Sequence, residues 1–278
     1  MKLKRFLFGL LFSSAIGLVA ERRGSLTRSG AAGAVITGTT IFGFGGLSWG
    51  LTLIYFFVSS TLLSHFKERE KERVAGDKFS KGARRDIWQA LANGGVGTLA
   101  AFGYGLNSRS PGPPPLLAAF VGAMATANAD TWATEIGTLS SEPPRLITTG
   151  EPTAPGTSGG VTLLGTGAAV AGAATVGAVA EALGAARETP LRGRLPLLGL
   201  IGGLTGALTD SVLGATVQAI YWCPRCQKET EQRVHRCGEE TRLLRGFRWL
   251  DNDVVNFAST AAGALTALLG ARKLARRA

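Results

Sequence analysis

The segment ADTWATEIG, residues 129–137, places the carboxylates of Asp130 and Glu135 at the end of an apolar run. Residues 110–129 before them carry no ionisable side chain. Carboxylate oxygens are typical ligands of Mg²⁺. Positions five apart point about 140° apart on a helix, so one ion can bind both only if the helix ends or unwinds near Thr131. We therefore expect a helix end and a Mg²⁺ site here; a polar helix end at a membrane interface is the alternative.

A glycine-rich run, Gly156-Thr157-Ser158-Gly159-Gly160, follows Arg145 in a loop rich in Pro and Gly. We expect this run to open a membrane helix, where unpaired N–H groups and the positive end of the helix dipole favour an anion. The glycines let a phosphate approach the backbone, and Thr157 and Ser158 can donate hydroxyl hydrogens. The pattern predicts phosphate binding by Arg145 and residues 156–160, with a simple N-cap as the alternative.

Further carboxylates occur where apolar segments begin or continue. Asp210 is the only charge in residues 195–224, and an ionisable residue at membrane depth is usually functional. Asp130 and Asp210 each have Ala three positions earlier and Thr or Ser directly after, a weak sign of duplication. The predicted catalytic carboxylates are Asp130, Glu135, Asp210, Asp251 and Asp253, with Mg²⁺ expected on Asp130, Glu135 and Asp253.

Basic and amide side chains add phosphate-binding candidates. Loop 65–86 is basic in its second half, where Lys81 and Arg85 are predicted to bind phosphate; contact with water or anionic lipid is the alternative. Asn93 lies just inside the next apolar segment, and Asn256 shares a helix face with Asp253 at the start of the last one. We expect Asn93 to point into the bundle and Asn256 to supply an oxygen ligand for a cation or a nucleotide, and both are candidate substrate- or phosphate-binding residues.

All three cysteines lie in CPRCQKETEQRVHRC, within the loop formed by residues 221–253. Cys223, Cys226, His235 and Cys237 provide four soft ligands, enough for a closed tetrahedral Zn²⁺ site. A closed site has no open position for substrate, so the predicted zinc is structural.

The elements that carry these residues are predicted to be membrane helices. Only 18% of the 278 residues are charged, against about a quarter in soluble proteins, and 39 are glycine. Residues 29–64 carry no charge, and one helix of that length would reach about 54 Å, so two spans joined near residues 43–46 fit a hydrocarbon core of about 30 Å better. Similar windows are 6–20, 87–108, 110–129, 152–180, 195–224 and 254–271.

These windows predict an all-α polytopic membrane protein, a single domain over residues 1–278 with a bundle of seven or eight transmembrane helices. A soluble protein with buried helices is the alternative. Small residues dominate the windows, which favours close helix packing. Residues 1–20 are either a span, a segment that does not fully cross, or a cleaved signal peptide.

The net charge of +11 indicates orientation rather than nucleic-acid binding, because Lys and Arg gather on the cytoplasmic side of membrane proteins. With eight spans, loops 21–28, 65–86, 130–151 and 225–253 share one side and hold 19 of the 30 Lys and Arg residues. We therefore expect loop 65–86, the Asp/Gly-rich loop 130–160 and the Cys/His loop 221–253 to face the cytoplasm.

The signatures NADTWATEIG, PRLITTG with PGTSGG, DSVLGATVQ, the Cys/His loop and GFRWLDNDVVNF together resemble the transmembrane protein 19 family, over most of residues 85–270. That family includes the plant and cyanobacterial phytyl-phosphate kinase. The resemblance implies phosphoryl transfer from a nucleotide, with CTP expected, to an isoprenyl monophosphate. A looser likeness to CTP-dependent polyprenol kinases is weakened because Pro155 stands where those enzymes have Glu.

The acidic side chains, the glycines and the groups that can donate hydrogen bonds to phosphate together suit phosphoryl transfer, which depends on positioning and charge neutralisation. We therefore predict a Mg²⁺-dependent membrane kinase of phytyl or geranylgeranyl phosphates. Its expected partners are the lipid phosphate, a nucleotide and the bilayer. An ion-coupled transporter or lipid flippase is the alternative, in which Asp210 would couple to an ion.

Overall fold

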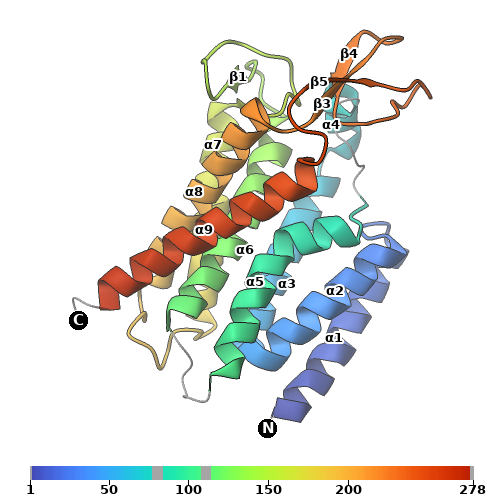
Figure 1. The fold of residues 1–278 in the computed structure, drawn as a ribbon. Helices are drawn as coiled ribbons and strands as arrows, with labels where there is room; N and C mark the ends of the chain where they lie inside the picture. Colours follow the sequence, from blue (N-terminus) through green and yellow to red (C-terminus); the bar gives the residue numbers. More distant parts are fainter. Residues whose placement is uncertain (1, 77–83, 108–113, 276–278) are drawn as a thin grey trace.

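The computed structural model describes residues 2–76, 84–107 and 114–275. Its long helical segments run lengthwise side by side (Figure 1). They are α1 (Lys2–Arg22), α2 (Arg28–Thr40) with the π-helical η1 (Ile41–Gly45), α3 (Leu47–His65), α5 (Ile87–Leu106), α6 (Pro114–Gly137), α7 (Leu163–Ala182), α8 (Leu195–Thr216) and α9 (Asn252–Ala275).

The short elements gather at one end of the bundle, which we call the strand end (Figure 1). They are α4 (Glu68–Ala75), the antiparallel pair β1 (Arg145–Leu146) and β2 (Gly160–Val161), and a sheet of β3 (Ile220–Cys223), β4 (Lys228–Thr230) and β5 (Arg242–Arg245). In that sheet β3 lies between the other two strands, antiparallel to both. Both chain termini and the connection between α7 and α8 lie toward the opposite end. The described parts of the three predicted functional loops therefore lie at one end of the bundle.

Local sequence explains where several helices begin and end. Gly46 has a φ of 92° and separates η1 from α3, which confirms the predicted junction at residues 43–46. Asp86 caps α5 by accepting a hydrogen bond from the Gln89 backbone, while the Gln89 side chain accepts one from the Asp86 backbone. These reciprocal bonds fix the start of α5 at the strand end.

Helix α6 is the centre of the bundle. It packs against α3, α5, α7, α8 and α9, and every residue from Leu117 to Ala129 is buried. A Cβ atom added to Gly122 would lie 2.5 Å from the Gly263 carbonyl oxygen, so α6 and α9 touch backbone to backbone. The small residues therefore permit the close packing that the sequence predicted.

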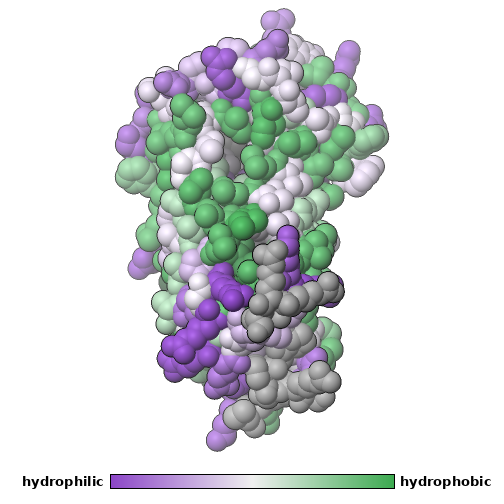
Figure 2. Space-filling view, turned by 90° about the vertical axis from the view of Figure 1, so that its left-hand side faces the viewer, coloured by the Kyte–Doolittle hydropathy of each residue, from purple (hydrophilic) through white to green (hydrophobic). Residues whose placement is uncertain are grey.

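Five helices in the described ranges are long and apolar enough to cross a membrane: α1, α3, α7, α8 and α9. Helix α2 is too short by itself, while α5 and α6 are not apolar enough, so the predicted seven or eight spans are not confirmed by this measure. Helix α6 can be less apolar because it lies at the centre of the bundle, where other helices shield it from lipid. In Figure 2, hydrophobic side chains cover the middle of one face and hydrophilic ones lie at both ends.

One expectation for α6 was wrong. The helix neither ends nor unwinds near Thr131 but continues to Gly137. The Thr131 hydroxyl donates to the Ala127 carbonyl oxygen within the helix, at 2.8 Å, and leaves the backbone pattern intact. Asp130 and Glu135 consequently point in different directions and do not share one ion.

Candidate functional site

Asp130 and Asp210 approach each other where α6, α8 and α9 cross. The crossing is tight: an added Cβ at either Gly206 of α8 or Gly263 of α9 would collide with the Thr126 side chain of α6. Asp130 and Asp210 lie four residues after Thr126 and Gly206, about one turn toward the strand end. The glycine crossing thus sets the separation between two carboxylates from distant parts of the sequence.

Asp210 has an unusual environment. The charges of Asp130 and Glu231 act on it, and the Ser259 side chain of α9 hydrogen-bonds to it. Its second oxygen, Oδ2, is buried and has no hydrogen-bond partner within the described residues. A buried carboxylate oxygen without a donor is costly, which makes this position suitable for a cation or a proton.

Glu231 is the acidic neighbour that the sequence did not reveal. Its Oε1 accepts hydrogen bonds from Ser158 Oγ at 2.7 Å and from Gln218 Nε2 at 2.8 Å, and Gln218 is only 2% exposed. Arg245 of β5 lies within range of the Glu231 charge and donates to the Gly214 carbonyl oxygen at 2.9 Å. Burial lowers the pKa of Arg245, and the charges of Glu229 and Glu231 oppose that change.

The run 156–160 does not open a helix. Its two hydroxyls donate within the protein, Thr157 to the Ala154 carbonyl oxygen and Ser158 to Glu231. Gly156 and Gly159 have φ angles of 76° and 82°, outside the helical region, and Gly159 packs against the α8 backbone at Ala215. Helix α7 begins later, capped by Thr162. The glycines therefore have a structural explanation, and the expected helix-opening cradle is absent from this described segment.

Glu135 belongs to a separate ionic group. Its carboxylate pairs with Lys71 of α4 and accepts a hydrogen bond from Ser64 Oγ at 2.6 Å. Lys71 is 8% exposed and also donates to the carbonyl oxygens of Leu63 and Ser64. Burial lowers the pKa of the Arg85 guanidinium, and the nearby Glu135 charge opposes that change. Glu135 therefore pairs with Lys71 of α4, and its charge acts on Arg85.

The remaining predicted residues occupy several places. The exposed Asp251 caps α9, because its Oδ1 accepts hydrogen bonds from the backbone of Asp253 and Val254, both at 3.1 Å. Arg145 is exposed and donates to the Gly150 carbonyl oxygen. Asn93 of α5 is half-buried, and its amide donates to the Gln89 carbonyl oxygen. Asp253 is also half-buried, whereas Asn256 of α9 is buried. Lys81 lies outside the described residues.

The Cys/His cluster forms as predicted. The ligand atoms of Cys223, Cys226, His235 and Cys237 all lie within 4.8 Å of one another. The sulfurs of Cys223 and Cys237 are 3.7 Å apart, close to the roughly 3.8 Å expected for two thiolates on a tetrahedral zinc. The Nε2 atom of His235 is buried without a partner in the described residues, and all three cysteines are free. A hydrogen bond from His235 lowers the pKa of Cys237 to about 6. These donors fit a metal ion.

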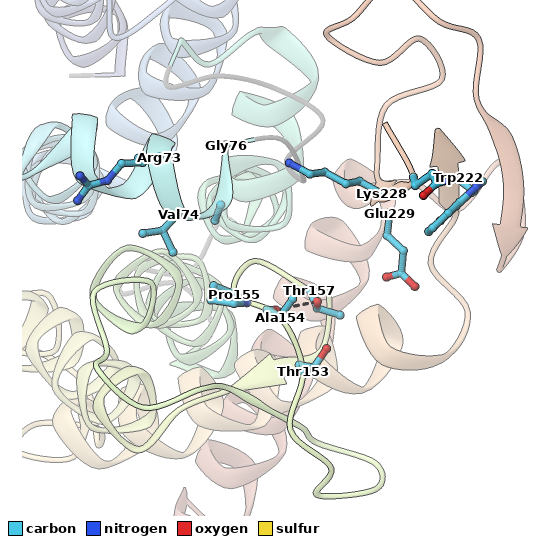
Figure 3. Close-up of a pocket in the computed structure, with 12 residues that line it drawn as sticks. Arg73, Val74, Gly76, Thr153, Ala154, Pro155, Thr157, Trp222, Lys228 and Glu229 are labelled. Atoms are coloured by element: carbon cyan, nitrogen blue, oxygen red, sulfur yellow. Dashed lines mark hydrogen bonds between the residues drawn. The ribbon is translucent and has the colours of Figure 1, made fainter. Parts of the chain in front are cut away.

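A hollow of about 440 Å³ lies at the strand end between α4, the loop before β2 and the β3–β4 hairpin (Figure 3). Thr153, Thr157 and the half-exposed Trp222 contribute to its wall. Figure 3 shows Lys228 extending across toward Gly76, with Glu229 pointing toward the threonines. The hollow therefore has both polar and apolar walls, and it adjoins the loop that carries Ser158.

Fold and site together define a class: an α-helical membrane protein with two half-buried carboxylates near a helix crossing, and with a Cys/His cluster outside the bundle that can bind a metal ion. The chain belongs to the family described as integral membrane protein DUF92, which matches residues 11–264. The family expected from the sequence motifs is thereby confirmed, and so is an integral membrane location.

Similar proteins occur in a plant and an archaeon. Protein PGR of Arabidopsis thaliana is 34% identical over 271 residues, covering 92% of each chain. The uncharacterized membrane protein MJ0933 of Methanocaldococcus jannaschii is 30% identical over 76% of this chain and 82% of its own length. Protein VTE6, chloroplastic, of Arabidopsis thaliana is 27% identical over 88% of this chain and 65% of its own length. No solved structure is significantly similar.

Proposed function

We propose that this protein is a membrane kinase that transfers a phosphoryl group from a nucleotide to an isoprenyl monophosphate and releases the diphosphate. CTP is the expected donor, and a phytyl or geranylgeranyl phosphate is the expected acceptor. The observation that carries the proposal is the meeting of Asp130 and Asp210 at the crossing of α6, α8 and α9, with one Asp210 oxygen buried and unpaired among the described residues.

Two acidic side chains suit Mg²⁺, which binds through one or two carboxylates and the phosphates of its substrate. The ion would neutralise charge on the transferred group, the main task of a phosphoryl-transfer site. Asp130 and Asp210 would hold the ion, and the Ser259 side chain hydrogen-bonds to Asp210. The lipid tail of the substrate would lie along the helices, with its phosphate toward the strand end.

Cations near this end suit the nucleotide phosphates. Arg245 lies beside Glu231, and Lys228 reaches across the hollow of Figure 3. That hollow opens at the strand end, where a water-soluble nucleotide can enter. Phosphate binding by Arg145, Lys81 and Arg85 is also part of this proposal. The charge of Glu135 already acts on Arg85.

The metal of the Cys/His cluster is proposed to be a structural Zn²⁺, because three Cys and one His complete a tetrahedron. The strand end is proposed to face the cytoplasm, where thiols stay reduced and available to a metal. Loops expected at this end carry 19 of the 30 Lys and Arg residues, in agreement with that orientation.

An ion-coupled transporter or lipid flippase is the second candidate. It is supported by the isolated carboxylate of Asp210 in an apolar helix and by the similar positions of Asp130 and Asp210 on α6 and α8. Such a protein would move its substrate across the bilayer without consuming a nucleotide.

An assay with purified protein in vesicles separates the two functions. Phytyl or geranylgeranyl phosphate is incubated with radiolabelled CTP and Mg²⁺, and the lipid diphosphate is measured. We expect turnover that Asp130→Asn or Asp210→Asn lowers by at least about a hundredfold, since each removes about 3 kcal/mol or more of charge stabilisation. Exposed Glu142→Gln, in the connection after α6, is the matched control and keeps full activity.

Absence of turnover with every nucleotide, while the same vesicles show flux of the lipid phosphate, would overturn the kinase and support the transporter. Equal activity of Asp210→Asn and the wild type would remove the observation on which the kinase proposal depends.

A further inference from the structure

A second hollow lies within the Cys/His loop, beside the sheet of β3, β4 and β5. Its volume is about 450 Å³, and it shares no lining residue with the hollow of Figure 3. Half of its lining residues are arginines and none is acidic; they are Tyr221, Arg233, Thr241, Arg242, Leu243 and Arg248. We call this place the arginine hollow, and its wall is strongly positive.

Contacts within the loop bring the segments that carry these arginines together without neutralising them. The Arg233 Nη2 atom donates to the carbonyl oxygen of Arg248 at 3.1 Å. The Thr241 hydroxyl donates to the carbonyl oxygens of Gln232 and Arg233, both at 2.8 Å, and holds the backbone there. Arg233, Arg242 and Arg248 are exposed, and none of them forms an ion pair within the described residues. Because positive charges held close together repel one another, an anion bound among them would be stabilising.

A phosphate group matches these donors. A guanidinium is planar, stays charged, and presents N–H groups that fit the oxygens of a phosphate in pairs. It carries five N–H donors, so the bond from Arg233 to the Arg248 carbonyl oxygen still allows Arg233 to hold an anion.

Apolar side chains beside the arginines indicate that the phosphate belongs to a lipid. Val234, Leu244, Phe247 and Trp249 are each more than half exposed, although they lie outside the bundle. The rings of Phe247 and Trp249 stack with their centroids 6.1 Å apart, on either side of Arg248 in the sequence. Helix α9, which is apolar enough to cross a membrane, begins three residues after Trp249. These side chains therefore lie near the membrane interface, where tryptophan is enriched and where basic and apolar side chains together bind anionic lipids.

We propose that the arginine hollow binds the phosphate of a membrane lipid through Arg233, Arg242 and Arg248, while Phe247 and Trp249 contact the apolar chain of that lipid. A soluble anion would account for the arginines but not for the exposed aromatic pair. The ligand chemistry is a phosphate on an apolar chain, which an acidic phospholipid or an isoprenyl phosphate can supply. The inference goes beyond the proposed kinase, because this hollow is separate from the crossing of α6, α8 and α9 and binds a lipid whether or not phosphoryl transfer occurs.

Native mass spectrometry of the purified full-length protein in detergent counts the lipid molecules that it retains. The protein is titrated with phosphatidic acid, with phytyl phosphate, or with phosphatidylcholine, whose headgroup has no net charge. We expect the two lipids that end in a phosphate to bind more tightly than phosphatidylcholine. The ratio of their two affinities distinguishes a bilayer phospholipid from an isoprenyl phosphate as the preferred ligand.

Substitutions in the hollow test its role directly. Arg233→Gln and Arg248→Gln should each lower the affinity for the preferred lipid roughly tenfold, as for loss of one charge-assisted hydrogen bond. The matched control is Arg236→Gln, which removes the same charge from an exposed position of the same loop that does not line the hollow. Thermal unfolding midpoints check that the variants fold. Trp249→Ala tests the apolar contact independently and should also weaken binding of both lipids.

Two results would overturn the lipid site. Equal losses of affinity in Arg236→Gln and Arg233→Gln would mean that the lipids are attracted by the charge of the whole loop. Displacement of the bound lipid by an equal concentration of inorganic phosphate would mean that the hollow binds a free anion.

The outcomes also separate this inference from the proposed kinase. Lipid binding that depends on Arg233 and Arg248, without phosphoryl transfer, upholds the arginine hollow and overturns the kinase. Phosphoryl transfer by a protein whose lipid affinity is unchanged in both variants overturns the inference and leaves the kinase standing.

Discussion

Acidic residues of the same type have different roles in this protein because their partners differ. Glu135 has a paired carboxylate, with Lys71 and Ser64 as donors. Asp251 satisfies the start of a helix. Asp210 alone among these three keeps a buried oxygen without a described partner. The distinction depends on which donors each carboxylate finds, and the oxygen of Asp210 that finds none is the one proposed to bind a cation.

Breaking the Lys71–Glu135 pair should destabilise the protein. The side chains are 9% and 22% exposed, so Lys71→Met leaves a largely buried carboxylate without its main partner. We expect the free energy of unfolding to fall by about 3 kcal/mol, measured from loss of helicity during detergent denaturation. Lys67→Met is the matched control, because its pair with Glu70 is exposed and should contribute less than about 1 kcal/mol.

A small effect of Lys71→Met, equal to that of Lys67→Met, would contradict this account of Glu135. It would restore Glu135 as a candidate for binding an ion or phosphate-bound metal.

Some site residues could be predicted from the sequence and others could not. The four ligands of the Cys/His cluster lie within one short loop, so their spacing alone indicates the site. Asp130 and Asp210 were predicted because a charge in an apolar run is conspicuous. Glu231 lies in a polar loop where acids are ordinary, and its partner Ser158 is 73 positions away in the chain. Only the fold reveals that contact.

Glycines decide how the helices are spaced. Gly122, Gly202 and Gly263 meet where α6, α8 and α9 cross, and each lies too close to a neighbouring backbone to accept a side chain. Thr126 adds a hydroxyl that donates to the carbonyl oxygens of Gly122 and Gly202. A change at this crossing should therefore move Asp130 away from Asp210, since these residues follow Gly122 and Gly202 by about two turns on the same helices.

Gly122→Ala tests this spacing. The new methyl group would lie 2.5 Å from the Gly263 carbonyl oxygen, so α6 and α9 must separate, at a cost of about 1–3 kcal/mol. We expect a lower thermal unfolding midpoint together with weaker binding of Mn²⁺, used as a paramagnetic substitute for the proposed Mg²⁺. Gly167→Ala in α7 is the control, since an added Cβ there meets nothing within 4 Å; it should be neutral or slightly stabilising because alanine favours helices. If both variants unfold alike, backbone contact does not set the spacing.

Element boundaries were predicted where the cause is local and missed where it is not. The glycines at residues 43–46 interrupt a helix through their own backbone freedom, as Gly46 shows. The helix of ADTWATEIG persists past the expected end because its polar side chains find partners on other elements, such as Lys71 for Glu135. Gly156–Gly160 fails to open a helix because Gly160 and Val161 pair with β1.

At the scale of the whole molecule, polar function is concentrated at one end. The acidic region, the Cys/His cluster and the hollow of Figure 3 all lie toward the strand end, although their residues come from most of the chain. The hydrophobic middle in Figure 2 separates this end from the connection between α7 and α8. Such a distribution suits a catalyst that receives a lipid from the bilayer and a soluble donor from one compartment.

This polarity predicts a single orientation, which cysteine labelling can measure. Glu142 lies at the strand end and Glu188 in the opposite connection, and both are exposed. Because Lys and Arg favour the cytoplasmic side, a membrane-impermeant maleimide should label Glu188→Cys in intact cells and Glu142→Cys only after the membrane is opened. The wild type gives the background of its three native cysteines. The reverse pattern would place the proposed cation site outside the cell, away from cytoplasmic nucleotides, and would overturn the kinase. Labelling of both cysteine variants in intact cells would mean that the bundle does not span the bilayer.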